Sequence, residues 1–244
     1  MKELTNNPAD TSKYEISDTQ KKEIENDLRE KMGLASIGFD KHETLIYDKR
    51  EPAIRGSEKM RELILSAIDD QKNVFLVCNY SGANEVQFAK TDKGWIDVNS
   101  RITTYEIMFD FEDFENSRRY TPDVVLESYS LGILLFHEID HKVSYDPKYP
   151  IPPTGVRPDK SSRGVRGVIE NTNIVRRELS LVLRNSKRRI AKRYRGANQI
   201  FTNTRQITFK GPAGKRNFLR WKLESKRPKM QRADATSRVK LGNV

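Results

Sequence analysis

The pattern of apolar and polar positions predicts two helices in the first part of the chain. The first begins at a capping residue, Ser17 or Asp18, carries apolar residues four positions apart, and stops at Gly33. A second helix is expected over residues 57–70, where apolar residues repeat every three or four positions. Each helix therefore has one apolar face that must pack against another part of the protein.

Four strands are predicted to follow these helices. Their patterns are either continuous apolar runs or alternations, and they span residues 74–80, 85–90, 95–99 and 101–111. Two turn sequences, at 81–84 and 91–94, separate the first three of these strands. We therefore expect a small sheet immediately before the next helix.

A third helix is predicted from Thr121 to about residues 144–147, because a capping threonine is followed by Pro122 in the first turn. Its buried side is expected to comprise Val124, Leu126, Tyr129, Ile133, Phe136 and Ile139. Residues 148–164 are rich in Pro, Gly and Ser, which indicates an irregular loop. A fourth helix is expected over residues 168–196, with a short strand after it at 206–209. The chain as a whole is predicted to have an α+β fold.

The third predicted helix contains His137, Glu138 and His141 in the order H-E-x-x-H. Residues four apart share one face of a helix, so both imidazoles can bind the same metal ion. Glu138 is then placed to take a proton from a water molecule. Catalytic zinc sites use this arrangement, and the motif therefore predicts Zn²⁺ and a metal-assisted hydrolase. A chance match is the alternative, but two of the three histidines of the chain fall in this apolar run.

A catalytic zinc site usually takes three protein ligands and one water molecule. His42 lies far upstream and has no spacing argument in its favour, so the candidates are acidic residues after the motif. Glu170, on the next predicted helix and beside Asn171, is the preferred third ligand. Asp159 in the loop and Asp146 just past the motif helix are open alternatives.

The chain has few hydrophobic residues for its length, and its charge changes from acidic in the first part to basic in the second. Only 36% of residues are hydrophobic and 32% are charged, so part of the length is expected to lie outside a packed core. Residues 1–156 hold 20 Lys+Arg against 29 Asp+Glu, whereas residues 157–244 hold 25 against 5. We expect a flexible leader at 1–18, a zincin-like metallopeptidase domain at 19–200, and a basic, partly disordered C-terminal extension at 201–244.

The basic C-terminal region gives a second interpretation. Cations at 187–196 and the aromatic residues Phe218 and Trp221 could bind an acidic partner, nucleic acid or an anionic membrane. The alternative function is therefore a basic nucleic-acid or anionic-surface binding protein with a non-catalytic zincin-like fold. No nucleic-acid recognition motif is present, so the hydrolase is preferred. The sequence also lacks an apolar stretch of membrane-spanning length and a secretory signal peptide, and its one cysteine, Cys78, excludes an internal disulfide.

The motif helix and the segment after the loop resemble the type III secretion effector zinc metallopeptidases of the NleD type, a family also found as toxin domains of Rhs proteins. The family pattern is an H-E-x-x-H helix followed by a segment close to E-N-x-I-R-x-E-L-G-L-P-L-R. Residues of this chain that match the second segment are Asn173, Arg176, Glu178, Leu179, Leu181 and Arg184. The glutamate of the family pattern falls on Thr172, and Ser180 and Val182 replace its glycine and proline.

The resemblance implies a zincin-like fold, with a small sheet packed on the motif helix and a second, C-terminal helix. It also implies a zinc endopeptidase, secreted without a classical signal peptide and delivered into a host or target cell, where it cleaves a particular protein. In such an enzyme a positively charged or hydroxyl donor stabilises the oxyanion, and Tyr145, Arg176 and Arg184 are all candidates. For the two arginines we expect solvated side chains or ion pairs with acidic neighbours such as Glu178.

Overall fold

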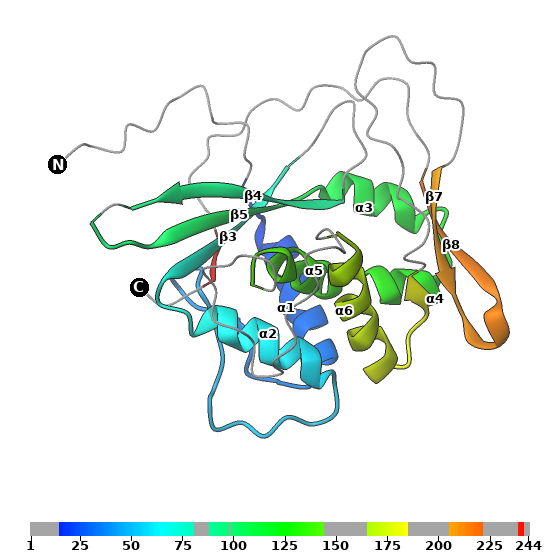
Figure 1. The fold of residues 1–244 in the computed structure, drawn as a ribbon, viewed down its shortest axis with the longest axis horizontal. Helices are drawn as coiled ribbons and strands as arrows, with labels where there is room; N and C mark the ends of the chain where they lie inside the picture. Colours follow the sequence, from blue (N-terminus) through cyan, green and yellow to red (C-terminus); the bar gives the residue numbers. More distant parts are fainter. Residues whose placement is uncertain are drawn as a thin grey trace, which may run out of the picture.

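The structure, a computed structural model, describes residues 15–80, 88–97, 99–143, 165–184, 205–221 and 239–241. It is a mixed α+β fold (Figure 1). The helices are α1 (Asp18–Met32), α2 (Glu58–Ile68), α3 (Phe111–Arg118), α4 (Asp123–Leu126), α5 (Leu131–Val143) and α6 (Val165–Glu178), with 3-10 turns η2 (Glu127–Tyr129) and η3 (Pro212–Gly214). The strands are β1 (Gly38–Phe39), β2 (Leu45–Ile46), β3 (Asn73–Asn79), β4 (Ala89–Ile96), β5 (Thr103–Phe109), β6 (Leu183–Arg184), β7 (Arg205–Lys210), β8 (Arg216–Trp221) and β9 (Val239–Leu241). No helix in these described ranges is long and apolar enough to cross a membrane.

A four-stranded sheet in the order β4-β5-β3-β9 forms one layer of the fold. β3 and β5 are parallel, with Asn73 opposite Thr103 and Asn79 opposite Phe109, and β4 and β9 flank them as antiparallel strands. Figure 1 shows α1, α2, α5 and α6 gathered on one side of these strands. The apolar faces of the helices and of β3 and β5 meet in one hydrophobic core.

The predicted helices near the start of the chain are confirmed. In α1 the Ser17 hydroxyl accepts from the Gln20 backbone N–H and the Gln20 side chain accepts from the Ser17 N–H, which is a reciprocal capping box. The helix ends at Gly33, which adopts a left-handed conformation with φ +68°. α2 has Ser57 as its N-cap, and the Ser57 hydroxyl also donates to Glu178 Oε2 of α6 at 2.5 Å.

The strands agree with the prediction only in part, since β1, β2, β6, β8 and β9 were not predicted. β3 and β5 lie where the apolar runs indicated, whereas the turn expected at 91–94 is wrong because one continuous strand, β4, runs through it. Pairing with β5 holds these polar residues extended, and a bulge between Lys93 and Ile96 absorbs the irregularity. The predicted strand at 85–90 lies mostly outside the described residues.

The predicted helix that begins at Thr121 is broken rather than continuous. The chain forms α4, passes through η2, and becomes extended at Ser130 (φ −79°, ψ 168°) before α5 begins. Val124 on α4 is 42% exposed, although the sequence pattern had placed it in the core. Tyr129 and the apolar residues of α5 are buried as expected.

The fourth helix is shorter than predicted. α6 ends at Glu178, and Ser180 takes a left-handed φ of +56° that turns the chain into β6. Residues 185–200, the rest of the predicted helix, lie outside the described part of the chain. The 201–244 segment contributes the β7–β8 hairpin, whose Phe209, Leu219 and Trp221 are buried in the same hydrophobic core as the helices.

The beginning of α5 is anchored by α1. The Gly132 backbone N–H donates to Asp27 Oδ2 at 2.6 Å, and a Cβ at position 132 would lie 2.8 Å from the same oxygen, so a larger residue there would displace the Asp27 side chain. The carboxylate also complements the positive end of the helix dipole. Burial raises the pKa of Asp27, because the carboxyl is enclosed between the two helices.

We expect Asp27→Ala to destabilise the protein by about 1–3 kcal/mol, since the Gly132 N–H loses its charged acceptor. Urea denaturation of Asp18→Ala provides the control, because the Asp18 side chain is fully exposed and should cost less than about 0.5 kcal/mol. Equal free energies of unfolding for the two variants would contradict the anchoring role.

Candidate metal centre

α5 brings the three motif residues together. Metal-ligating atoms of His137, Glu138 and His141 all lie within 4.8 Å of one another, and no other group of this kind occurs among the residues that the structure describes. The imidazole rings are 4.9 Å apart between centroids and nearly perpendicular. His137 and Glu138 are each only 6% exposed, so the group is enclosed by protein on most sides. The predicted juxtaposition of the two histidines is therefore present.

α6 fixes the proton position on His137. Thr172 Oγ1 donates to the Val168 carbonyl oxygen at 2.6 Å, and it lies 2.8 Å from His137 Nδ1. Because a hydroxyl has a single proton, Oγ1 can only accept from Nδ1–H of the histidine. Nε2 of His137 is then the nitrogen with a free lone pair, which is how ligating histidines are usually oriented by their surroundings.

Both imidazoles are held neutral. Burial lowers the pKa of His137 well below its ordinary value, and the positive charges of Arg184 and Arg176 lower it further. Burial, with Lys142 and Arg184, lowers the pKa of His141 to about 4. Zinc requires neutral imidazole ligands, so these two residues are ready to bind it at neutral pH without losing a proton.

Glu138 is tied to the edge strand of the sheet. Thr91 Oγ1 on β4 lies 2.8 Å from Glu138 Oε2 and 3.1 Å from the Glu138 carbonyl oxygen, and its proton is donated to these acceptors. Burial raises the pKa of Glu138 to about 7, against the lowering effects of Thr91 and Arg184. A carboxylate with a pKa near 7 suits a general base at neutral pH.

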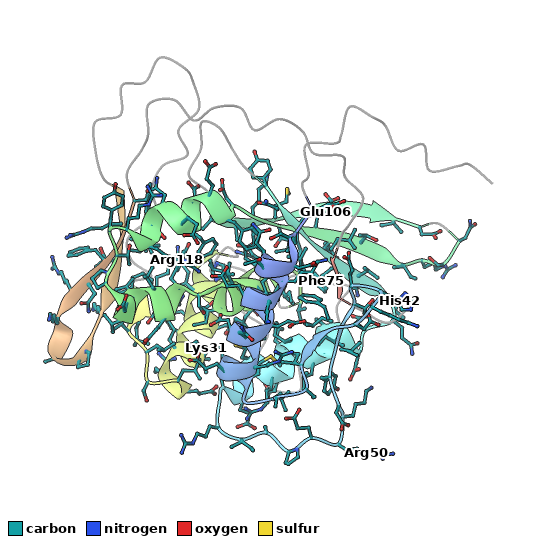
Figure 2. All side chains as sticks on the ribbon, turned by 180° about the vertical axis from the view of Figure 1, so that it is seen from behind. Lys31, His42, Arg50, Phe75, Glu106 and Arg118 are labelled. Carbon is teal, nitrogen blue, oxygen red and sulfur yellow. The ribbon has the colours of Figure 1, made fainter. Side chains whose placement is uncertain are left out.

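The structure does not bring Glu170 to the two histidines. Its side chain is exposed, and it stands about 200° around α6 from Thr172, the residue that contacts His137. Asn171, expected to support Glu170, instead donates to both carboxylate oxygens of Asp140 at 3.0 and 3.3 Å. His42 is exposed at the outside of the molecule (Figure 2).

The other candidate ligands, Asp146 and Asp159, and the candidate donor Tyr145 lie outside the described residues.

The two contacts from Thr91 and Thr172 were missed by sequence reasoning. Thr172 carried one signal, since it stands where the pattern of the NleD-type enzymes, which the sequence resembles, has a glutamate. Thr91 carried none, because it stood in a segment interpreted as a turn.

Arg176 and Arg184 are buried, so the expectation of solvated or ion-paired arginines is wrong. Arg176 Nε donates to the Ser128 carbonyl oxygen at 2.8 Å and Nη1 donates to Asn173 Oδ1 at 3.1 Å, with the guanidinium over the Phe209 ring. Burial lowers the pKa of Arg176 to about 9. The expected partner, Glu178, accepts instead from Ser57 and from the Lys59 backbone N–H of α2.

Thr172→Val should weaken zinc binding about 10- to 100-fold, because the His137 ring loses the acceptor that fixes its tautomer. Competition with a fluorescent zinc chelator measures the affinity. Thr172→Ser is the matched control, since it keeps the hydroxyl, and it should bind zinc like the wild type. Equal affinities for the valine and serine variants would contradict this orienting role.

The raised pKa of Glu138 gives the metal-free protein a pH-dependent stability. Between pH 4.5 and 7 the folded chain keeps a proton that the unfolded chain releases, so the contribution of Glu138 is full below pH 4.5 and is lost as the pH rises through 7. In chelator-treated protein, the wild type should therefore lose on the order of 3 kcal/mol relative to Glu138→Gln between pH 4.5 and 8.

Urea denaturation across this pH range measures the difference. Glu170→Gln is the control, because it makes the same change at an exposed carboxylate. A Glu138→Gln variant with the same pH dependence as the wild type would show that the carboxyl titrates normally.

Comparisons with protein-family models, with curated proteins and with solved structures find no match to this chain. Its function must therefore be inferred from the chemistry of the site.

Proposed function

We propose that this chain is a zinc-dependent endopeptidase with a zincin-like fold, which hydrolyses a specific protein in a target cell. The observation that carries the proposal is the group of His137, Glu138 and His141 on one buried helix, with ligand atoms within 4.8 Å. Two neutral imidazoles beside a carboxylate are the donor set that zinc hydrolases use. Within this group of described residues, His137 and His141 supply the nitrogen ligands.

The place of β4 supports a peptide substrate. β4 is the edge of the described sheet, pairs with β5 on one side only, and contacts α5. Thr91 on β4 is hydrogen-bonded to Glu138, so an extended peptide added to this edge would run beside the carboxylate. This arrangement would place a backbone carbonyl of the substrate near the motif residues.

Zinc, when bound, supplies a Lewis acid that lowers the pKa of water and polarises a carbonyl group. The roles of the chain's own residues follow from their contacts. His137 and His141 would hold the ion, with Thr172 orienting the His137 ring. Glu138 would accept a proton from the attacking water and pass it to the amine that leaves when the C–N bond breaks.

Delivery into a target cell is supported by the resemblance to the NleD-type effectors. The basic region at 157–244 would then serve to hold an acidic partner, or an anionic surface, near the enzyme.

Binding of nucleic acid or of an anionic membrane as the primary function is the second candidate. One observation favours it: the β7–β8 hairpin exposes four cations, which are Lys210, Lys215, Arg216 and Arg220. Such binding would weaken steeply with salt and would survive Glu138→Gln, whereas proteolysis would not.

The proposal is tested by zinc content and peptide cleavage measured on the same preparations. Wild type should carry about one zinc per chain by elemental analysis, and it should cleave peptides in a library made from cellular proteins, read by mass spectrometry. Glu138→Gln should keep the zinc and lose cleavage by about 10²–10⁴-fold. His137→Ala should lose the zinc while circular dichroism shows a folded protein.

The Glu170→Gln variant tests whether Glu170 is the third zinc ligand, as the sequence predicted. Since the side chain is exposed and outside the cluster, we expect this variant to keep its zinc. Loss of zinc in a folded Glu170→Gln would restore Glu170 as the third ligand. A wild type that takes up no zinc would overturn the proposed function.

A further inference from the structure

Arg184 is held rigidly at the end of the segment that follows α6. Its backbone N–H donates to Asn173 Oδ1 at 3.0 Å, and its carbonyl oxygen accepts from Asn173 Nδ2 at 2.9 Å. On β6 it also pairs with Phe209 of β7. The residue is 4% exposed. Both the position of its backbone and its burial are therefore set by α6 and the hairpin sheet.

The guanidinium of Arg184 has a donor that the described part of the protein does not use. Nη2 is buried and has no hydrogen-bond partner there. Buried donors are nearly always paired, because an unmade hydrogen bond to a charged group is costly. Arg176 on α6 donates from Nε to Ser128 and from Nη1 to Asn173, and it has no buried guanidinium nitrogen left without a partner in the described part of the chain.

The charge of Arg184 acts on all three motif residues. It is among the causes that lower the pKa values of His137, Glu138 and His141, which indicates that the guanidinium lies close to the metal-binding group. The element that carries it agrees, because Asn173 holds Arg184 and the adjacent Thr172 holds His137. The segment that carries this spare donor is thus anchored on the same turn of α6 that contacts His137.

We propose that Arg184 is a catalytic residue whose Nη2–H donates to the negatively charged oxygen that forms on the scissile carbonyl when water adds to it. This inference rests on the proposed peptidase function. A preorganised donor aimed at developing charge in an enclosed site stabilises the transition state more than the ground state. Among the three donors considered from the sequence, Arg176 already donates from Nε and Nη1 to other residues, and Tyr145 lies outside the described residues.

Inorganic phosphate is a suitable probe, because it is a tetrahedral anion that can contact a metal ion and a guanidinium together. The protein is loaded with cobalt(II), whose visible absorption reports only on anions bound at the metal, so phosphate on the basic surface is not counted. Metal stoichiometry is measured first on every variant. We expect Arg184→Met to bind phosphate about 10- to 100-fold more weakly than the wild type.

Two further variants make the result specific. Arg184→Lys keeps the charge but loses the guanidinium fork, so it should recover only part of the affinity. Arg177→Met removes an exposed arginine from α6 and should bind phosphate like the wild type. If Arg184→Met does not fold, the comparison of Arg184→Lys with the wild type decides, because that change preserves the buried cation.

The measurements distinguish a failure of the proposed role of Arg184 from a failure of the proposed peptidase function. Unchanged phosphate affinity in metal-loaded Arg184 variants would overturn the role of Arg184 and leave the peptidase in place. Loss of metal in a folded Arg184 variant would also overturn it, since the residue would then serve to maintain the site. A wild type that takes up neither zinc nor cobalt would overturn both.

Discussion

Burial of polar groups on α5 is the constraint on which the rest of the structure depends. This helix is enclosed by α1, α2, α6 and the sheet, yet it carries His137, Glu138 and Asp140 into the interior. A buried polar group without a hydrogen-bond partner is destabilising, so each must be met by a group from another element. The surrounding elements therefore supply both the apolar core and a set of aimed hydroxyl and amide groups.

α6 meets most of this requirement with three consecutive residues. Asn171 donates to Asp140, Thr172 accepts from His137, and Asn173 holds the backbone of Arg184. Consecutive residues on a helix point about 100° apart, so one turn of α6 reaches three different parts of the site. The position of α6 therefore determines both which ring nitrogen of His137 carries the proton and where the backbone of Arg184 lies.

The sequence predicted those features that local patterns determine. Capping residues and apolar spacing located α1 and α2, and continuous apolar runs located β3 and β5, because each element's own residues favour it. The i, i+4 spacing likewise placed His137 and His141 together, since a single helix carries both.

The features that were not predicted come from contacts between distant segments. The extended conformation at 91–94 depends on pairing with β5 and on the Thr91 contact to Glu138, and the early end of α6 depends on Ser180 turning the chain toward β7. The burial of Arg176 and Arg184 was hidden for the same reason. Their surroundings are assembled from Ser128, Asn173 and the β7 strand, which no local pattern connects.

The contacts of α5 also determine when the site can form during synthesis. Asp27 and Thr91 precede the helix, whereas Thr172 follows it, so partners arrive from both directions along the chain. Contacts between residues far apart in sequence form late, after the intervening segments have collapsed. A nascent chain that has emerged only as far as residue 143 thus possesses both histidines but not the hydroxyl that orients the first. The centre can therefore assemble only after α6 has been synthesised.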